Sequence, residues 1–257
     1  YRRQQRPPMG KFDLARAPQE SRFAFRITGA LERADSYRDQ QFLDREALAA
    51  SVLFKASAAT SLLLQMDHLK DSRITDFGIP ALNGRPVDVR PGAYYGAANA
   101  RDVDVSTSKV DSIGLTLNHR INDSLALRNA FRYYTYSLDR NNTLTRSVNA
   151  RDLTFTLNHG NVDRDEHGWF NQTELTQKTH LFGMKHQLLY GVEVGQQNKD
   201  LVNFSSPVTD ANGRIRDFAL FNPELPRLPL STSRAPSANN LGTFKTSAFY
   251  AQDLVEL

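Results

Sequence analysis

The sequence of 257 residues contains no cysteine and a single tryptophan. The absence of cysteine excludes a disulfide framework and a thiolate nucleophile or metal ligand. Long apolar runs are also missing, because the most apolar segment, Ala47–Phe54, is much shorter than the roughly 20 residues of a membrane-spanning helix. The first residues, Tyr1–Pro8, lack the apolar centre of a signal peptide. If the protein is exported, we therefore expect this sequence to be a mature form.

Charged residues are abundant but not concentrated in one place. The 32 lysines and arginines against 28 acidic residues give a net charge of +4. No basic tract is typical of a nucleic-acid-binding arm, so no nucleic-acid partner is expected. With 40% hydrophobic residues, a transmembrane β-barrel remains compatible with the composition, because only alternate residues of each strand of about ten residues need to face lipid.

The segment Gly168–Asn198 carries the clearest pattern, that of two strands joined by a tight turn. The turn, Leu181–Met184, contains a glycine that can adopt the positive φ of a short hairpin. In the second strand one side is mostly apolar and the other mostly polar, which is typical of a half-buried strand. The mostly apolar side consists of His186, Leu188, Tyr190, Val192 and Val194, and the other of Gln187, Leu189, Gly191, Glu193 and Gly195.

The segment Arg22–Arg33 alternates in the same way. Phe23, Phe25, Ile27, Gly29 and Leu31 share one side, and Arg22, Ala24, Arg26, Thr28, Ala30 and Glu32 share the other. A water-soluble sandwich seldom buries a face with two arginines and a glutamate. A barrel with a wet lumen and a lipid-facing outside shows this division, and so does a sheet with one solvated face.

Further segments with strand character are Gly10–Ala15, Phe42–Lys55, Leu62–Lys70, Val110–Arg120, Leu125–Tyr136 and Thr246–Leu257. A helix over Arg45–Leu69 is an alternative, but its apolar positions fit a period of two better than a period of 3.6. We predict about nine antiparallel strands in one curved sheet that is open at both edges.

The connections between the predicted strands are alternately short and long. The short ones are Ala17–Glu20, Ser57–Thr60, Ile121–Ser124 and Leu181–Met184, and the long ones are Asp71–Lys109, Leu138–His167 and Lys199–Lys245. Ser36–Gln41 is a short exception. Short turns at one end and long loops at the other are typical of outer-membrane barrels. For the strand directions to alternate, Leu153–Leu157 must extend the strand that begins near Trp169.

Four segments spread along the chain carry a family resemblance. They are ALERADSYRD at Ala30–Asp39, DSRITDFGIPALNGRPVDVRPGAYYG at Asp71–Gly96, NQTELTQKTHLFGMKHQLLYGVEV at Asn171–Val194 and FYAQDLVEL at Phe249–Leu257. In this order and spacing they resemble the barrel of bacterial TonB-dependent siderophore receptors, of the ferrichrome and related ferric-siderophore type. The resemblance implies an all-β, antiparallel transmembrane barrel fragment with long extracellular loops, contributing about nine strands of a barrel of about 22.

The resemblance also implies a location, partners and a mode of action. Residues 1–257 are expected to form part of the barrel domain in the bacterial outer membrane, in contact with its lipid, and the plug domain and TonB box are absent from them. The expected function is the binding of ferric siderophores and their import, driven by the TonB complex through the plug. No enzyme activity is expected, and no cofactor, since the iron is carried within the siderophore.

Other chemistries lack support in the sequence. The six histidines form no spaced metal set, Asp102 and Asp104 near Asp111 resemble a calcium loop only superficially, and no G-x-S-x-G motif is present. The alternative function is a soluble or surface β-sheet module for binding or adhesion, without transport.

In the resembling receptors, aromatic and polar groups hold the ligand in an extracellular vestibule. The loop Asp71–Lys109 is the candidate contribution of this chain, with Tyr94 and Tyr95 as aromatic contacts and Arg85 and Arg90 as positive charges for an anionic chelate. We further expect Phe23, Phe25, Ile27, Leu31, Ile113, Leu115, Leu117, Leu188, Tyr190 and Val192 to face lipid. Arg26, Arg128, Arg132, Gln187 and Glu193 should face the lumen.

Overall fold

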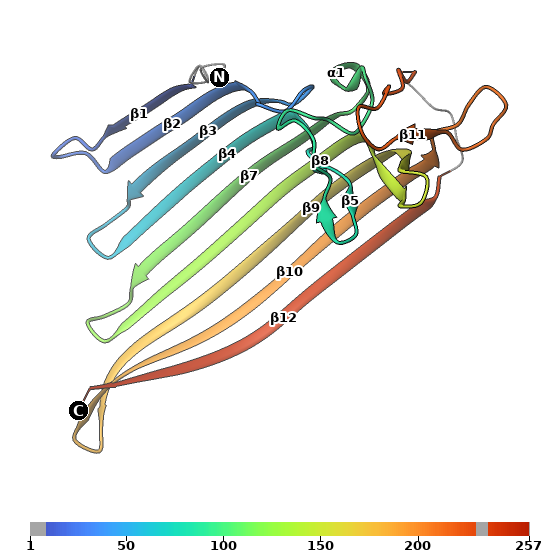
Figure 1. Ribbon diagram of the computed structural model, residues 1–257. Coiled ribbons are helices and arrows are strands. Elements are labelled where there is room, and N and C mark those ends of the chain that lie inside the picture. The colour runs from blue at the N-terminus through green and yellow to red at the C-terminus, as the bar shows by residue number, and fades with distance from the viewer. Residues whose placement is uncertain (1–8, 230–235, 257) are drawn as a thin grey trace.

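A computed structural model describes residues 9–229 and 236–256, and almost all of the regular structure lies in one antiparallel sheet (Figure 1). Along the sheet the strands follow one another as β1-β2-β3-β4-β7-β8-β9-β10-β12, and β11 pairs separately with β9. The strands are β1 (Met9–Arg16), β2 (Phe23–Asp35), β3 (Phe42–Lys55), β4 (Thr60–Ile74), β7 (Val105–Arg120), β8 (Leu125–Asn149), β9 (Thr154–Leu181), β10 (Met184–Pro207), β11 (Asp217–Ala219) and β12 (Ala238–Glu256). A small hairpin, β5 (Ala81–Leu82) and β6 (Arg85–Pro86), and one helical turn, α1 (Ala100–Val103), lie between β4 and β7.

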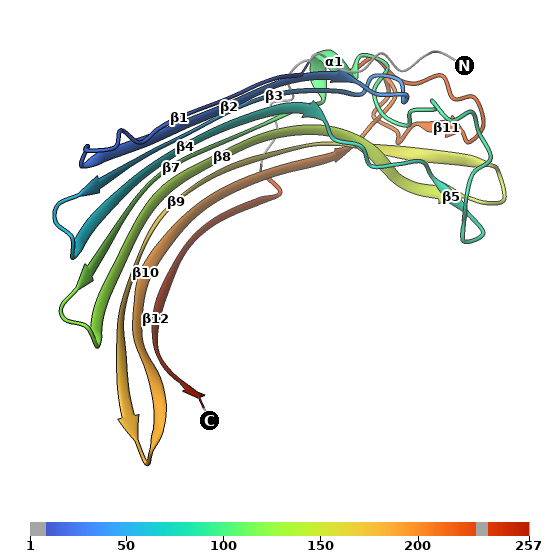
Figure 2. The ribbon, with the colours of Figure 1, turned by 90° about the vertical axis from the view of Figure 1, so that its left-hand side faces the viewer.

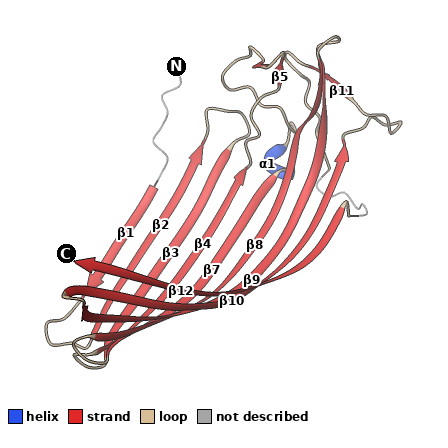
Figure 3. Ribbon diagram, turned by 90° about the horizontal axis from the view of Figure 1, so that it is seen from below, coloured by secondary structure: helices blue, strands red, loops and turns tan. Residues whose placement is uncertain are grey.

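The sheet is strongly curved and open, because β1 and β12 form its two edges and do not pair with each other (Figures 2 and 3). This confirms the predicted sheet of about nine strands and the barrel-fragment architecture. The segment for which a helix was the alternative forms β3 and β4, as the period of two indicated. Within the described residues, no helix has the length and apolar character needed to cross a membrane.

Cross-strand pairing divides the sheet into two chemically different faces. One row of register partners, from β2 to β8, is Phe25, Val52, Leu64, Leu115 and Phe131. The row beside it, on the opposite face, is Arg26, Ser51, Gln65, Gly114 and Arg132. We call these the apolar face and the polar wall. The register places all ten predicted lipid-facing residues on the apolar face and all five predicted lumen-facing residues on the polar wall.

The apolar face is open along the middle of the sheet. Leu115 is 44% exposed and Phe25 is 37% exposed. In the described part of the chain, the only other sheet is the two-residue pairing of β5 with β6. A β-sandwich would need a second sheet over this face, so the fold matches a sheet that turns its apolar side to lipid.

Polar and aromatic residues border the apolar face at both ends. On the side of the long loops, Tyr133 and Trp169 are register partners, and the next row holds His68 and Asp111, hydrogen-bonded at 2.7 Å. On the side of the short turns, the rings of Phe23 and Phe54 stack at 4.7 Å. Aromatic girdles followed by polar groups are typical of the two interfaces of a membrane.

Two of the predicted long loops are wrong. Much of Leu138–His167 belongs to β8 and β9, and part of Lys199–Lys245 belongs to β10 and β12. Beyond the loop-side border, polar residues such as the register partners Asp139 and Asp163 stand where the apolar face would continue, so the alternation on which the prediction relied disappears. The predicted extension at Leu153–Leu157 is confirmed from Thr154 onward.

The connection between β4 and β7 stays largely irregular, as predicted, and helps to form two apolar clusters with the ends of the strands. The first consists of Val87, Tyr95, Phe155, Leu157, Val208, Phe218 and Leu220. The second consists of Ile74, Tyr94, Ala97, Ala100 and Val103. Gly78 and Gly84 have φ values of 80° and 77°, as expected for the sharp turns of this loop.

Leu115 and Thr116 are neighbours in β7 on opposite faces and provide a matched test of this assignment. In the full-length protein inserted in lipid, Leu115→Arg should lower the free energy of unfolding by roughly 2–4 kcal/mol if the residue lies near the midplane. Thr116→Arg should cost much less, because that side chain meets the wet side. Urea unfolding from lipid vesicles measures both, and equal losses would contradict the two-faced sheet.

Candidate functional site

The polar wall carries networks of paired charges that cross several strands. Arg128 of β8 donates from Nη1 to Glu174 Oε2 of β9 at 3.0 Å. The other oxygen of Glu174 accepts a 2.8 Å hydrogen bond from Tyr250 of β12, and Gln172 donates to the same tyrosine oxygen at 2.6 Å. This network ties three strands together through side chains.

Tyr250 reaches Glu174 by lying across β10, which separates the two strands. Its register partner on β10 is Gly191. A Cβ atom on Gly191 would lie 2.0 Å from the tyrosine ring, far inside van der Waals contact. The glycine is therefore required by the close approach of the ring. Phe170 covers Gly195 in the same manner, with 2.4 Å to a Cβ placed there.

A second network lies on the polar wall near the loops. Asp71 of β4 accepts a hydrogen bond from Arg45 at 2.8 Å and is also paired with Arg73, and Arg45 lies 3.7 Å from Glu32. The two arginines and two carboxylates leave this network close to neutral.

Between these networks, Arg132 donates to Ser112 at 3.1 Å, and Ser112 donates to Asp67 at 3.0 Å. The wall is thus lined with hydrogen-bonding groups whose charges are mostly compensated within the sheet. Such a surface suits water or a polar protein segment and offers little to an apolar ligand.

The predicted ligand contacts Tyr94 and Tyr95 lie inside the loop clusters. Tyr95 is 4% exposed, packs edge-on against Phe155 at 5.2 Å between ring centroids, and donates its hydroxyl to the carbonyl of Leu220 at 2.7 Å. Tyr94 is 9% exposed and packs in the second cluster with Ile74. Both rings hold the loops together in this structure, and their contact with a ligand stays a prediction.

A buried polar group accompanies Tyr94. Asp104, at the end of α1, is 1% exposed and accepts a 2.9 Å hydrogen bond from Thr143, while His159 lies 3.4 Å from the same carboxylate oxygen. Burial, and next the negative charge of Asp104, raise the pKa of Tyr94. This group fastens the β4–β7 connection to β8 and β9.

The predicted arginines occupy the outer surface of the loops. Arg85 is exposed in the β5–β6 hairpin, and Arg90 is exposed and paired with Asp39. The four predicted residues therefore do not converge on one pocket: two are interior and two are on the surface.

Sequence reasoning missed the residues that organise the polar wall. Gln172, Glu174 and Tyr250 lie within segments that carry the family resemblance, but no role was predicted for them, and Gly191 was only one member of an alternation. The available signal was the glycine in GVEVG, because a glycine in a strand often marks the close approach of another group. Among the described residues, no three histidine, aspartate or glutamate side chains are grouped so that they could hold a metal ion.

Comparison with known proteins identifies the kind of sheet this is. The family model for TonB-dependent receptor-like β-barrels matches residues 51–257. The chain is 24% identical over 182 residues to the metal-pseudopaline receptor CntO of Pseudomonas aeruginosa, covering 71% of this chain and 25% of that receptor. It is 25% identical over 244 residues to the catecholate siderophore receptor Fiu of Escherichia coli K12, covering 87% of this chain and 31% of that receptor.

Solved structures agree on the fold. The open form of the ferric-catecholate import receptor Fiu from E. coli K12 superposes with a TM-score of 0.78 at 21% sequence identity, over 96% of this chain and 40% of that one. The chain thus spans between a quarter and a third of the length of the curated relatives it matches.

Gly191 and Gly114 both lie on the polar wall and allow a controlled test of the glycine–tyrosine contact. Gly191→Ala should lower the free energy of unfolding by about 1–3 kcal/mol, because the methyl group displaces Tyr250 and breaks its bond to Glu174. Gly114→Ala is the control, since the nearest atom to its added Cβ lies at 3.7 Å. Equal effects in urea unfolding would show that the tyrosine does not need the glycine.

Alkaline titration tests the burial of Tyr94. Its pKa is raised above 10.0, so the folded loop keeps the phenol neutral where an exposed tyrosine ionises. The contribution of the neutral, buried phenol to the free energy of unfolding is fully present below the unfolded-state pKa of Tyr94. It is lost as the pH rises through the folded-state pKa. The tyrosinate absorbance of the wild type should therefore rise in an additional step at high pH, and this step should be missing from the titration of Tyr94→Phe. Ionisation of Tyr94 together with the exposed Tyr37 would contradict the burial.

Proposed function

Because the chain belongs to the TonB-dependent receptor-like β-barrel family, we propose that it forms part of the barrel wall of a receptor that binds ferric siderophores and imports them. Proteins of this family reside in the bacterial outer membrane. The relatives are receptors rather than enzymes, and two of them carry names that refer to catecholate siderophores and to metal-pseudopaline.

The observation that carries this proposal is the division of one sheet into two faces. Phe25 and Leu115 stand on a face that no other described segment covers, while Arg128 and Glu174 form an ion pair on the other face of the same sheet. A wall between lipid and a wet interior needs both properties at once. An adhesion module without transport needs only one solvated face.

In the proposed mechanism, the chain supplies position and polarity rather than covalent chemistry. The loops around β5, β6 and α1 contribute to capture of the chelate outside the cell, and the polar wall surrounds the plug that the TonB complex moves. Iron stays within the siderophore, so the wall needs no metal ligands. The compensated charges of the wall leave few sites where a charged cargo would be held on its way inward.

The surface arginines of the loops support an anionic cargo. Arg90 and Arg101 are exposed and each pairs with an aspartate, and Arg85 has no ion-pair partner in the described part of the chain. A ferric chelate that carries negative charge would meet these groups first, and its rate of association would rise at low salt. In this scheme Tyr94 and Tyr95 hold the loops in place and, as proposed from the sequence, also contact the ligand.

The binding test uses the full-length receptor in cells and compares two double variants. Tyr94→Ala with Tyr95→Ala removes one ring from each apolar cluster and should abolish high-affinity binding of ferric siderophore at unchanged surface abundance. Arg85→Gln with Arg90→Gln should weaken binding by about two- to fivefold, because exposed charges each contribute little in water. Arg22→Gln, an exposed arginine on the side of the short turns, is the control and should leave affinity unchanged.

Uptake separates transport from simple binding. A strain that depends on this receptor for iron should grow on a ferric siderophore as sole iron source only when TonB is present. Binding without uptake in a strain with TonB would favour the adhesion module. If both double variants bound the siderophore with unchanged affinity, the ligand site would lie outside these loops.

A further inference from the structure

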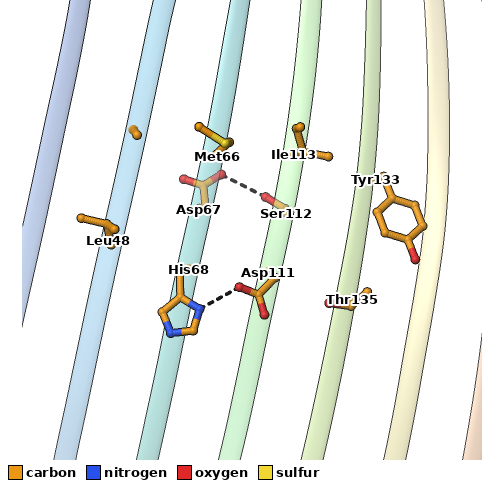
Figure 4. A pocket seen from close by; sticks show the side chains of 10 residues that line it. Leu48, Met66, Asp67, His68, Asp111, Ser112, Ile113, Tyr133 and Thr135 are labelled. Carbon is orange, nitrogen blue, oxygen red and sulfur yellow. Dashed lines mark hydrogen bonds and ion pairs between the residues drawn. The ribbon is translucent and has the colours of Figure 1, made fainter.

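Most arginines of the polar wall are held by a partner on the same face. Arg132 of β8 donates to Ser112, and Figure 4 shows the hydrogen bond by which Ser112 in turn reaches Asp67. The others pair with carboxylates: Arg26 with Asp13, Arg128 with Glu174, Arg45 and Arg73 with Asp71, and Arg164 with Glu166.

Arg140 of β8 is an exception to this pairing. It lies on the same face as Arg132, farther along the strand toward the long loops. Its Nε is buried without a hydrogen-bond partner, and its guanidinium forms no ion pair in the part of the chain that the structure describes. The two Nη atoms stay accessible. Because a partly buried charged donor without a partner is costly, this group is suited to an acceptor that comes from elsewhere.

The wall leaves no carboxylate over for Arg140. Asp104, which directly precedes β7, is 1% exposed and accepts a hydrogen bond from Thr143, with His159 at 3.4 Å. In the five polar-wall rows from that of Arg132 to that of Arg140, positive side chains outnumber negative ones by three. These rows hold Lys11, Arg26, Arg45, Arg73, Arg132, Arg140, Arg164 and Lys199 against Asp13, Glu32, Asp67, Asp71 and Glu166.

The neighbours of Arg140 on this face are small or polar. Its register partner Ser106 is the second residue of β7, so Arg140 stands directly below the β4–β7 connection. Gly160 of β9 lies diagonally beside it, and a Cβ there would lie 2.9 Å from the carbonyl oxygen of Phe204. No larger residue fits at Gly160, which leaves space next to the guanidinium.

An aromatic surface lies lower on the same face. The ring of Tyr136 carries the guanidinium of Arg164 at 5.2 Å from its centroid. A molecule that leaves the long loops for the interior therefore meets the unpaired Arg140 first and a tyrosine next.

We propose that Arg140 is a specificity-determining residue that binds a negatively charged ferric chelate on the wall, directly below the loops. The inference rests on the proposed function and adds the charge class of its cargo. Carboxylate or phenolate oxygens of the chelate accept hydrogen bonds from the Nη atoms, since the planar fork of a guanidinium fits two neighbouring oxygens. An uncharged chelate gains little from this contact, so Arg140 selects for anionic cargo.

The test uses the full-length receptor in detergent and ferric tris-catecholate, a negatively charged complex, with radioactive iron. Arg140→Gln should weaken equilibrium binding about tenfold, because a hydrogen bond to a charged group contributes on the order of a factor of ten. Arg140→Lys keeps the charge without the fork and should recover part of this loss. The wild-type affinity should fall as salt is added, and it should fall less steeply in Arg140→Gln.

Lys109→Gln is the matched control. Lys109 is exposed, and its register partner Ser137 lies three residues before Arg140, but it belongs to the opposite face of the sheet. Its loss removes the same charge and should leave the affinity and its salt dependence unchanged. Equal losses in Lys109→Gln and Arg140→Gln would show that only the overall charge matters and would overturn the inference.

Further outcomes separate this inference from the proposed function. If the wild type bound an uncharged ferric tris-hydroxamate but no tris-catecholate, the inference alone would be overturned. If it bound neither complex and no other ferric siderophore, the proposed function would fail. Thermal unfolding accompanies each variant. If Arg140→Gln lowered the unfolding temperature and bound tris-catecholate as the wild type does, Arg140 would pair with another segment of the receptor, which would also overturn the inference.

Discussion

Every strand in the middle of this sheet separates two environments, and that constraint fixes how the strands pair. Side chains alternate with a period of two, so a slip of one residue in a single strand would turn its apolar residues to the wet side and its charges to lipid. The unbroken row from Phe25 to Phe131 shows that five successive strands keep the same phase. The tight turns preserve this phase. In the turn between β9 and β10, both Phe182 and Gly183 adopt positive φ, at 53° and 81°, as a two-residue hairpin connection requires.

Beyond the loop-side border the constraint changes, and the structure changes with it. Strands β8, β9 and β10 continue with polar residues on both faces, held by backbone pairing and by side-chain bonds such as the 2.9 Å contact of Asn161 with Asp139. Without lipid to cover them, the apolar residues at this end pack on one another. Tyr95, Phe155 and Leu220 form an interior of the ordinary globular kind, on top of a sheet that has none below.

These two regimes explain what could be predicted from the sequence. Where lipid meets one face, the alternation of apolar and polar residues correctly predicted the strands, their two faces and most of their turns. For β3, the predicted first and last residues are those of the structure. Where water meets both faces, the same reasoning turned long strands into loops, since Asp139 and Asp163 look like loop residues in the sequence. The candidate site suffered from a related limit. Tyr94 and Tyr95 are amphipathic and fit a ligand contact or a packed interior equally well. Only their partners in the folded chain distinguish the two, such as Leu220, which lies 125 residues beyond Tyr95 in the sequence.

Charge is treated differently on the two faces, and the difference follows from what each face meets. On the polar wall, Asp71 is matched by Arg45 and Arg73, and Glu174 by Arg128, because an unmatched charge facing a narrow interior would bind whatever opposite charge passed through it. On the apolar face, the pairs of Lys70 with Glu46 and of His68 with Asp111 stand at the loop-side border rather than in the middle rows. A charge in the middle rows would lose its hydration in lipid, whereas at the border water and lipid headgroups still surround it. The position of these charged rows along the strands therefore marks how deeply the sheet enters the membrane.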